Sequence, residues 1–285
     1  MKRLEVKAFG VTFRNPILLA SGTWSPRLNE LYPLSMLGGL VTKSITVEPR
    51  EGNPPPRIWE TEHGVLNSIG LENPGIDRFI NEVLPELEQL NPIIIVSIAG
   101  SKPEEFYTLV ERLNPTNVTA YEINVSCPNV ARGGIELGKD IASLLDMARN
   151  LYKLSHKPLI YKLSIVHDID QIVPLLTPYA DGFTLINSVP AMAIDLQTRR
   201  PQLGNVTGGL SGPTIKPIAL YAVHKAKKLT HLPVIGCGGV SKLEDVLEFI
   251  AVGASLVQVG SANFNHPLIG KELVAGLTNL INNME

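Results

Sequence analysis

Three groups of residues in the sequence could carry chemistry, and the first is a thiol flanked by amides. Cys127 lies in the segment 124–129 (NVSCPN) and is followed by the pair Gly133-Gly134. A thiolate can act as a general base, and a glycine-containing loop can close over a substrate and exclude water. A buried cysteine is also commonly an inert small hydrophobe, the role we expect for Cys237 between two glycines. Taken alone, Cys127 leaves both interpretations open.

Two lysines at the ends of apolar segments form the second group. Lys43 ends the run VTK and Lys162 ends the run LIYK. An ammonium group in such surroundings is costly unless a ligand or a partner carries the opposite charge, so each lysine either faces an anionic or electron-rich ligand or forms a structural ion pair. Several amides and hydroxyls are expected at the same ends of the strands as the two lysines. They offer donors and acceptors to a flat heterocycle with imide-like edges. These are Asn67, Asn124, Asn129, Asn187 and Ser188.

Glycine-rich turns form the third group. Gly236-Cys237-Gly238-Gly239 and Gly260-Ser261 each follow an apolar run near the C-terminus. Glycine allows backbone N–H groups to approach phosphate oxygens, although glycine pairs also make plain tight turns. The first turn does not complete the G-x-G-x-x-G pattern, because Ser241 stands where the third glycine belongs. A Rossmann dinucleotide site is therefore not indicated.

The elements that must position these groups alternate between short apolar runs and longer segments of helical period. This alternation is typical of parallel strands joined by crossover helices, and it favours a closed (β/α)8 TIM barrel of the α/β class over an open doubly wound sheet. Without a shift in composition, we expect one domain over residues 1–285. The expected strands are 17–20, 39–43, 93–98, 120–125, 159–163, 182–186, 233–236 and 255–259. The expected helices are 104–113, 141–154, 169–176, 215–229, 243–251 and 267–281, with Ser101, Asp140 and Ser241 as caps.

Two segments interrupt this alternation. Residues 48–73 contain EPREGNPPPR, which has too many prolines for a strand ladder or a helix interior, and residues 189–212 end in GNVTGGLSG. Excursions that follow barrel strands rise on the C-terminal face, where barrels place their chemistry. Both segments are predicted to be walls of one active site, although loops with no function remain an alternative.

Composition and net charge limit the classes of partner that the protein is expected to bind. The 285 residues are 44% hydrophobic and 18% charged, with a net charge of -2, so the overall charge does not recommend nucleic acid or an anionic membrane. Two cysteines are too few for a disulfide framework, a four-cysteine zinc site or an iron–sulfur cluster, and no metal site is expected. Without an apolar leader or a membrane-spanning run, we expect a cytoplasmic protein.

With these residues assembled, the chain resembles the class 1 dihydroorotate dehydrogenases over nearly its full length. The runs EPREGNPPPR and NVTGGLSGPTIKP are similar to those of the B subfamily, whose catalytic chain passes electrons to NAD through a separate subunit. The matching segments are ASGTW (20–24), TKSITVEPREGNPPPR (42–57), LNSIGLENPG (66–75), EINVSCPN (122–129), INSV (186–189), GGLSGP (208–213), IGCGGV (235–240) and VGSANF (259–264).

The resemblance implies a flavoprotein oxidoreductase of pyrimidine biosynthesis that uses FMN to oxidise (S)-dihydroorotate to orotate. Cys127 matches the family's base, which takes the C5 proton while hydride leaves C6 for flavin N5. The partner subunit would carry FAD and a 2Fe-2S cluster, and two such subunits would complete a heterotetramer around a homodimer of catalytic chains.

The resemblance also assigns binding residues. Those matching substrate positions are Lys43, Asn67, Ser68, Ile69, Gly70, Leu71, Asn124, Asn187 and Ser188, with Asn129 nearby. Those matching flavin positions are Ser21, Lys43, Ser44, Asn124, Lys162, Ile186, Gly212, Gly238, Gly239, Gly260 and Ser261, the last four around the phosphate. Lys162 would lie beside flavin N1 and O2, where negative charge accumulates on reduction.

The sequence departs from the family at two places. Ser97 stands where the family often has an asparagine amide against the flavin, so Ser97 takes that flavin position here. Glu62 and His63 replace a proline and a small residue, and we expect His63 to lie at the surface. Two other functions remain open: a fumarate-dependent homodimer of the A subfamily, and a flavin-free phosphate-binding barrel that acts as a lyase or a binding subunit.

Overall fold

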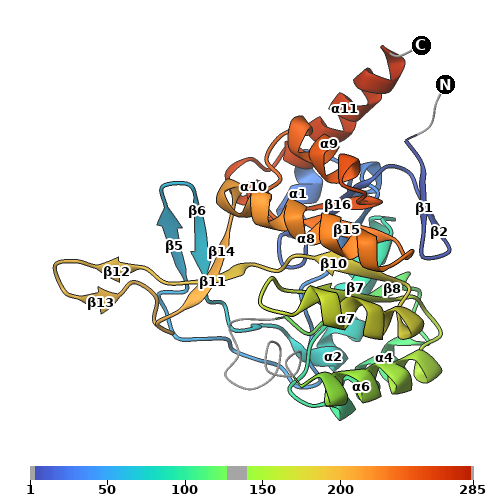
Figure 1. The fold of residues 1–285 in the computed structure, drawn as a ribbon, viewed down its shortest axis with the longest axis horizontal. Coiled ribbons are helices and arrows are strands. Elements are labelled where there is room, and N and C mark those ends of the chain that lie inside the picture. The colour runs from blue at the N-terminus through green and yellow to red at the C-terminus, as the bar shows by residue number, and fades with distance from the viewer. Residues whose placement is uncertain (1–3, 127–139, 284–285) are drawn as a thin grey trace.

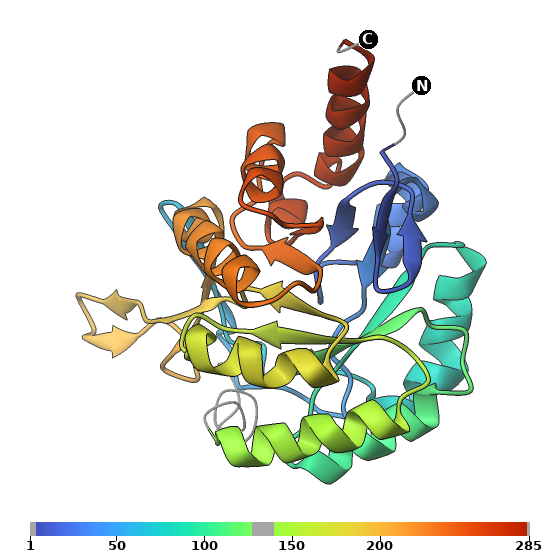
Figure 2. The ribbon, with the colours of Figure 1, turned by 45° about the vertical axis from the view of Figure 1, so that its right-hand side comes forward.

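Eight parallel strands close into a barrel in the order β3-β4-β7-β8-β9-β10-β15-β16, with helices packed around the outside (Figures 1 and 2). The computed structural model describes residues 4–126 and 140–283. The expectation of a (β/α)8 barrel is confirmed. The strands are β3 (Ile17–Leu19), β4 (Gly39–Val41), β7 (Ile94–Ile98), β8 (Ala120–Asn124), β9 (Leu159–Leu163), β10 (Gly182–Leu185), β15 (Val234–Cys237) and β16 (Leu256–Val259).

The six predicted helices are present, with ends that differ by two residues or fewer. They are α4 (Pro103–Leu113), α6 (Ile141–Leu154), α7 (Ile169–Leu176), α8 (Lys216–Leu229), α9 (Leu243–Ala251) and α11 (Ile269–Asn282). The short helices α1 (Pro26–Leu31), α2 (Gly75–Arg78), α3 (Leu84–Gln89) and α10 (Ala262–Asn265) were not predicted. A π-helical turn (Phe79–Val83) joins α2 to α3 in one continuous segment, and Pro85 interrupts the helical pattern of its sequence. Helices α1 and α10 are too short to show a period.

One of the three predicted helix caps is confirmed. The side chain of Asp140 accepts a hydrogen bond from the Ser143 backbone nitrogen at the start of α6. The predictions for Ser101 and Ser241 are wrong by one residue, because Lys102 and Lys242 occupy the N-cap positions of α4 and α9. At both helices an acidic side chain from the first turn accepts the backbone N–H of the serine, which leaves the serine outside the cap position.

The lower part of the barrel interior is apolar and is closed by a hairpin that the sequence analysis did not predict. Strands β1 (Val6–Ala8) and β2 (Val11–Phe13) pair antiparallel. Phe9 and Phe13 pack edge to face, with ring centroids 6.2 Å apart, against inward-facing Leu18, Val41, Ile95, Ile160 and Ile235. A Cβ at Gly182 would lie 2.2 Å from the Phe9 ring, so glycine at the start of β10 makes room for this hairpin.

The two excursions pair with each other. Strands β5 (Ile58–Thr61), β6 (Gly64–Asn67), β14 (Gly208–Ser211) and β11 (Val189–Ala191) form an antiparallel sheet in the order β11-β14-β6-β5. The hairpin of β12 (Ile194–Asp195) and β13 (Arg200–Pro201) extends from it, away from the barrel (Figure 1). The expectation that prolines would prevent a strand ladder in residues 48–73 is wrong for 58–67, because the prolines end at Pro56.

Within residues 4–126 and 140–283, no helix is both long enough and apolar enough to cross a membrane.

Candidate active site at the carboxyl ends of the barrel strands

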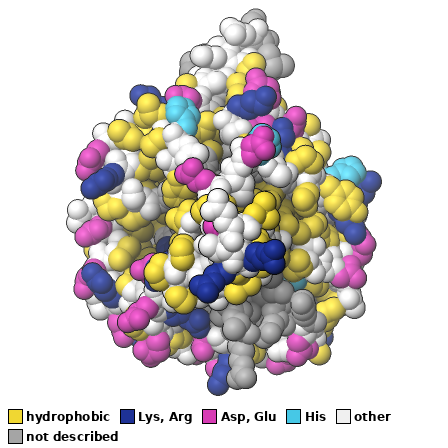
Figure 3. Space-filling view, turned by 90° about the vertical axis from the view of Figure 1, so that its left-hand side faces the viewer, with side chains coloured by type: hydrophobic (Ala, Val, Ile, Leu, Met, Phe, Trp, Pro, Cys, Tyr) yellow, Lys and Arg dark blue, Asp and Glu magenta, His cyan; other side chains and the backbone are white. Residues whose placement is uncertain are grey.

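A cavity of about 750 Å³ opens at the carboxyl ends of the barrel strands, and the excursion sheet forms one wall. Its volume lies in the range of small-molecule sites, roughly 300–1,000 Å³. Figure 3 views the molecule from the side that carries the excursions, where hydrophobic side chains gather around the centre of the face. The predicted residues that line the cavity are Ser21, Lys43, Ser44, Asn67, Ile69, Gly70, Leu71, Asn124, Lys162, Ile186, Asn187, Ser188, Gly212, Gly238, Gly239, Gly260 and Ser261.

Two predicted residues that the structure describes do not line the cavity. Ser68 is fully buried, and its hydroxyl accepts a hydrogen bond from Asn53 Nδ2 at 3.0 Å. Ser97 is also fully buried, with its Oγ 2.8 Å from Oγ of Ser44. Ser97 therefore supports Ser44 in the cavity wall, whereas Ser68 bonds to Asn53, which does not line the cavity.

Two further predictions, Cys127 and Asn129, fall outside the described residues. Ser126, which precedes Cys127, is the last described residue on that side and hydrogen-bonds to two residues of the cavity wall.

Hydrogen bonds with neighbouring hydroxyls and backbone N–H groups orient two of the cavity amides. Asn124 donates from Nδ2 to Ser44 Oγ at 3.1 Å, and its Oδ1 accepts from the Ser126 backbone at 3.2 Å. Asn187 donates from Nδ2 to Ser126 Oγ at 3.0 Å, while its Oδ1 accepts from the Ser188 backbone at 2.8 Å. Because each amide is held at both its nitrogen and its oxygen, the rim presents polar groups of fixed direction to a ligand.

Lys43 reaches the cavity from just beyond β4, and Gly22 lies under its side chain. A Cβ at Gly22 would lie 3.3 Å from Cδ and 3.5 Å from Nζ of Lys43. Gly22 has a φ of +79°, a conformation that favours glycine. Gly22 therefore leaves room for the lysine, a role that the sequence analysis missed although the residue lies in the ASGTW segment.

Lys162 combines the two alternatives that its sequence left open. It lines the cavity, and its Nζ also lies 3.2 Å from Oε1 of Glu122 inside the barrel. Both side chains are buried, with relative exposures of 6% for Lys162 and 0% for Glu122. The structural ion pair is present, and it lies directly at the cavity floor.

The turn at Gly238-Gly239 meets the beginning of α8 at one end of the cavity. Gly238 and Gly239 have φ values of +124° and +79°. A Cβ at Gly239 would lie 2.6 Å from Cβ and 2.8 Å from the backbone nitrogen of Lys216, so only glycine lets this turn pack against the helix start. A glycine turn beside a helix N-terminus is a typical anion site.

Cys237 ends β15 in the cavity floor, where burial raises the pKa of its thiol, Lys162 lowers it and Glu122 raises it. A raised pKa favours the neutral thiol at neutral pH, which agrees with the expected inert role. His63 lies at the surface as expected, 3.4 Å from Oε1 of Glu62.

Thirteen other residues that line the cavity were not predicted, although eight of them lie within the segments that carry the family resemblance. They are Ala20, Gly22, Thr23, Ile58, Glu60, Val65, Glu72, Ser211, Ile215, Cys237, Val240, Phe264 and Asn265.

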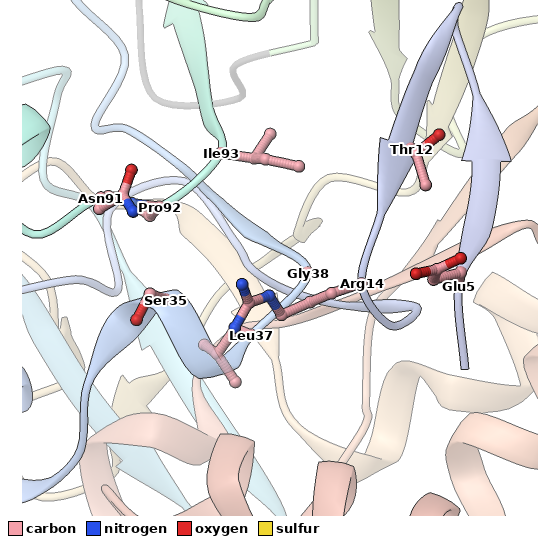
Figure 4. A pocket seen from close by; sticks show the side chains of 9 residues that line it. All are labelled: Glu5, Thr12, Arg14, Ser35, Leu37, Gly38, Asn91, Pro92 and Ile93. Carbon is pink, nitrogen blue, oxygen red and sulfur yellow. The ribbon is translucent and has the colours of Figure 1, made fainter. Parts of the chain in front are cut away.

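A smaller cavity of about 280 Å³ lies beside the opposite, amino-terminal ends of β4 and β7. The Arg14 side chain extends toward Leu37 across it (Figure 4). In barrels of this kind, chemistry is placed at the carboxyl ends of the strands, so this cavity is not part of the candidate site. It is lined by Glu5, Thr12, Arg14, Ser35, Leu37, Gly38, Asn91, Pro92 and Ile93.

Comparisons with known proteins agree with the resemblance seen in the sequence. A family model described as "Dihydroorotate dehydrogenase" matches residues 3–281. A relative from Bacillus cereus, named "Dihydroorotate dehydrogenase B (NAD(+)), catalytic subunit", is 41% identical over 289 residues, covering 100% of this chain and 94% of its own length. A relative of the same name from Petrotoga mobilis is 42% identical over 277 residues, covering 96% of this chain and 92% of its own length.

Among solved structures, the chain is similar to DHODH in complex with ferulenol from Eimeria tenella. The TM-score is 0.78 at 23% sequence identity, and the alignment covers 99% of this chain and 85% of the other. At this identity the likeness supports the barrel fold alone.

Proposed function

The chain belongs to the dihydroorotate dehydrogenase family, and from this premise we propose that it oxidises (S)-dihydroorotate to orotate with FMN, in de novo pyrimidine biosynthesis. One observation carries the proposal: a single cavity joins a glycine turn at a helix start, a lysine in the floor and a set of oriented amides. An enzyme of this kind needs an anion cradle for the cofactor, a cation near its ring and polar groups for the substrate.

The residues of the cavity fit FMN. Gly238, Gly239, Gly260 and Ser261 would surround the phosphate, because the backbone N–H groups of a glycine turn beside a helix start can approach an anion closely. Lys162 would lie beside the ring from the cavity floor. When bound, FMN would supply the acceptor for the hydride that leaves C6 of dihydroorotate.

The chain's own groups would bind and deprotonate the substrate. Asn124 and Asn187, each held by hydrogen bonds at both ends, would read the donor and acceptor edges of the pyrimidine ring. The ammonium group of Lys43 would balance the charge of the substrate carboxylate. Cys127 would take the proton from C5, because a thiolate is a competent general base near neutral pH.

The two excursions, residues 48–73 and 189–212, would form a wall over the bound substrate. Strand β6 brings Asn67 into this wall, where Asn67 Nδ2 donates to the backbone oxygen of Gly209 at 3.3 Å. The contact joins the two excursions at the cavity. A substrate bound there would be shielded from water, which strengthens its polar contacts.

We further propose that electrons leave this chain through a separate subunit that carries FAD and a 2Fe-2S cluster and reduces NAD. The relatives named above are catalytic subunits, which supports the existence of a second polypeptide. Exposed apolar side chains on and beside the excursions offer a surface for such a protein. They are Ile58, Trp59, Met192, Ile194, Leu196 and Phe264.

The flavin and the substrate can be tested together. We expect the purified protein to be yellow and to bleach when dihydroorotate is added without air. Colourless protein that gains no flavin on addition of FMN would contradict the proposal and support a flavin-free phosphate-binding barrel.

The electron acceptor needs a separate test. The chain is purified from its native source, and the preparation is assayed with dihydroorotate and either NAD or fumarate. We expect a second polypeptide to copurify and NAD to be reduced. Fumarate reduction by the chain alone would instead indicate the homodimeric alternative.

A further inference from the structure

A polar cluster lies inside the barrel beneath the cavity floor, where most barrel interiors are filled by apolar side chains. Glu122 on β8 is its centre. Its Oε1 lies 3.2 Å from Lys162 Nζ, and its Oε2 accepts hydrogen bonds from Gln258 Nε2 at 2.8 Å and from Thr184 Oγ1 at 3.0 Å. Glu122, Thr184 and Gln258 are fully buried. Four strands of the barrel thus contribute one side chain each.

The cluster is built for an ionised carboxylate. All three of these contacts place a donor against Glu122, and an ionised carboxylate is an acceptor only. Gln258 also accepts from Lys162, with its Oε1 at 3.5 Å from Nζ, so its amide is oriented by both members of the pair. The carboxylate is therefore held in place next to the lysine.

This ion pair changes the electrostatic field that Lys162 produces in the cavity. A buried ammonium group alone would place a full positive charge at the cavity floor. With a carboxylate 3.2 Å behind it, the pair is neutral overall, and its field weakens faster with distance than that of a single cation. Because the pair is shielded from solvent, the carboxylate opposes the lysine's field more strongly than a surface group would.

From this geometry we propose that Glu122 is a positioning residue that lowers the reduction potential of the bound flavin by attenuating the positive charge of Lys162. The inference rests on the proposed function. A full cation beside the flavin would stabilise its anionic reduced form and hold the electrons there. An enzyme that must pass electrons on to NAD, a weak oxidant, gains from a flavin that releases them readily.

The test replaces the charge and keeps the shape, with Glu122→Gln compared with wild type by spectroelectrochemical titration of the bound FMN. We expect the variant's flavin to be easier to reduce. Binding of reduced FMN should be favoured over binding of oxidised FMN by about tenfold more than in wild type, which corresponds to about 30 mV for a two-electron couple.

Thr184→Val is the matched control. It removes a hydrogen bond to Glu122 but leaves the ion pair, so the potential should stay close to that of wild type. If Glu122→Gln does not fold, Glu122→Asp withdraws the carboxylate from Lys162 and should shift the potential in the same direction by a smaller amount.

An unchanged or lower potential in the folded Glu122 variant, with FMN bound, would overturn the inference. So would an equal shift in Thr184→Val, because the effect would then come from packing and not from charge. Failure of the wild-type protein to bind FMN is a different outcome, and it would refute the proposed function.

Discussion

Replacing Lys162 by methionine tests whether the buried pair is as important for folding as its geometry indicates. Methionine keeps a long flexible chain but removes the charge. Among the residues that the structure describes, the neutral donors of Thr184 and Gln258 then remain to the fully buried Glu122. Breaking a buried pair by removing one partner costs about 3–5 kcal/mol, because an uncompensated charge remains. We therefore expect Lys162→Met to lower the free energy of unfolding by about that amount.

The second half of the experiment removes the stranded charge. In Lys162→Met combined with Glu122→Gln, neither position of the pair carries a charge, so the double variant should recover about 2 kcal/mol or more relative to Lys162→Met. The free energy of unfolding is measured by urea denaturation, followed by circular dichroism, on the flavin-free protein. Flavin is left out because a ligand that binds the folded state adds its own stabilisation.

Two results would refute this reasoning. The first is a loss below about 1 kcal/mol in Lys162→Met, which would mean that water or relaxation compensates Glu122 at the floor of the cavity. The second is simple additivity of the two substitutions, since residues in one ion pair should show a coupling energy. Either result would also weaken the electrostatic argument for the flavin.

Three further predictions concern the proposed base, the glycine turn and a buried carboxylate. Cys127→Ser should slow reduction of the flavin by dihydroorotate by about 10²-fold or more while FMN stays bound. Cys237→Ser is the matched control, and equal rates of flavin reduction in the two variants would reject Cys127 as the base. Gly239→Ala should weaken FMN binding and cost about 1–2 kcal/mol of stability, because the φ of residue 239 is +79° and the new Cβ would lie 2.6 Å from Cβ of Lys216. A variant that binds FMN with wild-type affinity in a fluorescence titration would contradict this prediction. Burial opposes ionisation of Asp245, but hydrogen bonds from Lys216 and the neighbouring backbone hold the pKa of its carboxyl below the ordinary value. The ionised carboxylate should therefore stabilise the fold above about pH 4, and this stabilisation should be lost as the pH falls through the lowered folded-state pKa. Between pH 5 and pH 3 the urea midpoint of wild type should therefore fall more than that of Asp245→Asn, and parallel pH profiles would show that Asp245 contributes nothing.

Local patterns in the sequence were sufficient to predict the barrel. Strands β7, β8 and β9 are buried throughout and read as short, mainly apolar runs, although β8 contains Glu122 and Asn124 and β9 contains Lys162. Such runs are typical of a parallel sheet covered on both sides. Because the carboxyl ends of parallel strands meet at one rim, residues far apart in the chain, such as Lys43, Asn124 and Asn187, were expected together, and the structure places all three at one cavity.

The sequence did not indicate the pairing of the two excursions. Asn67 lies opposite Gly209 in the sheet, and the two residues are 142 positions apart. Their segments carry no regular alternation, and no rule of local conformation chooses between partners at such a distance. The hairpin that closes the bottom of the barrel was missed for a similar reason, since its three-residue strands are too short to show a period.

Residue type and order along the chain therefore determined the barrel, the position of the cavity rim and the kinds of group that face a ligand, because these follow from strand-end position and side-chain chemistry. Only the tertiary structure decided how those groups act on one another. Lys162 was a candidate from its neighbours alone, but its partner Glu122 lies 40 residues earlier on another strand. Closure of the barrel brings the two charges within 3.2 Å, and at that distance in a buried site each sets the electrostatic environment of the other.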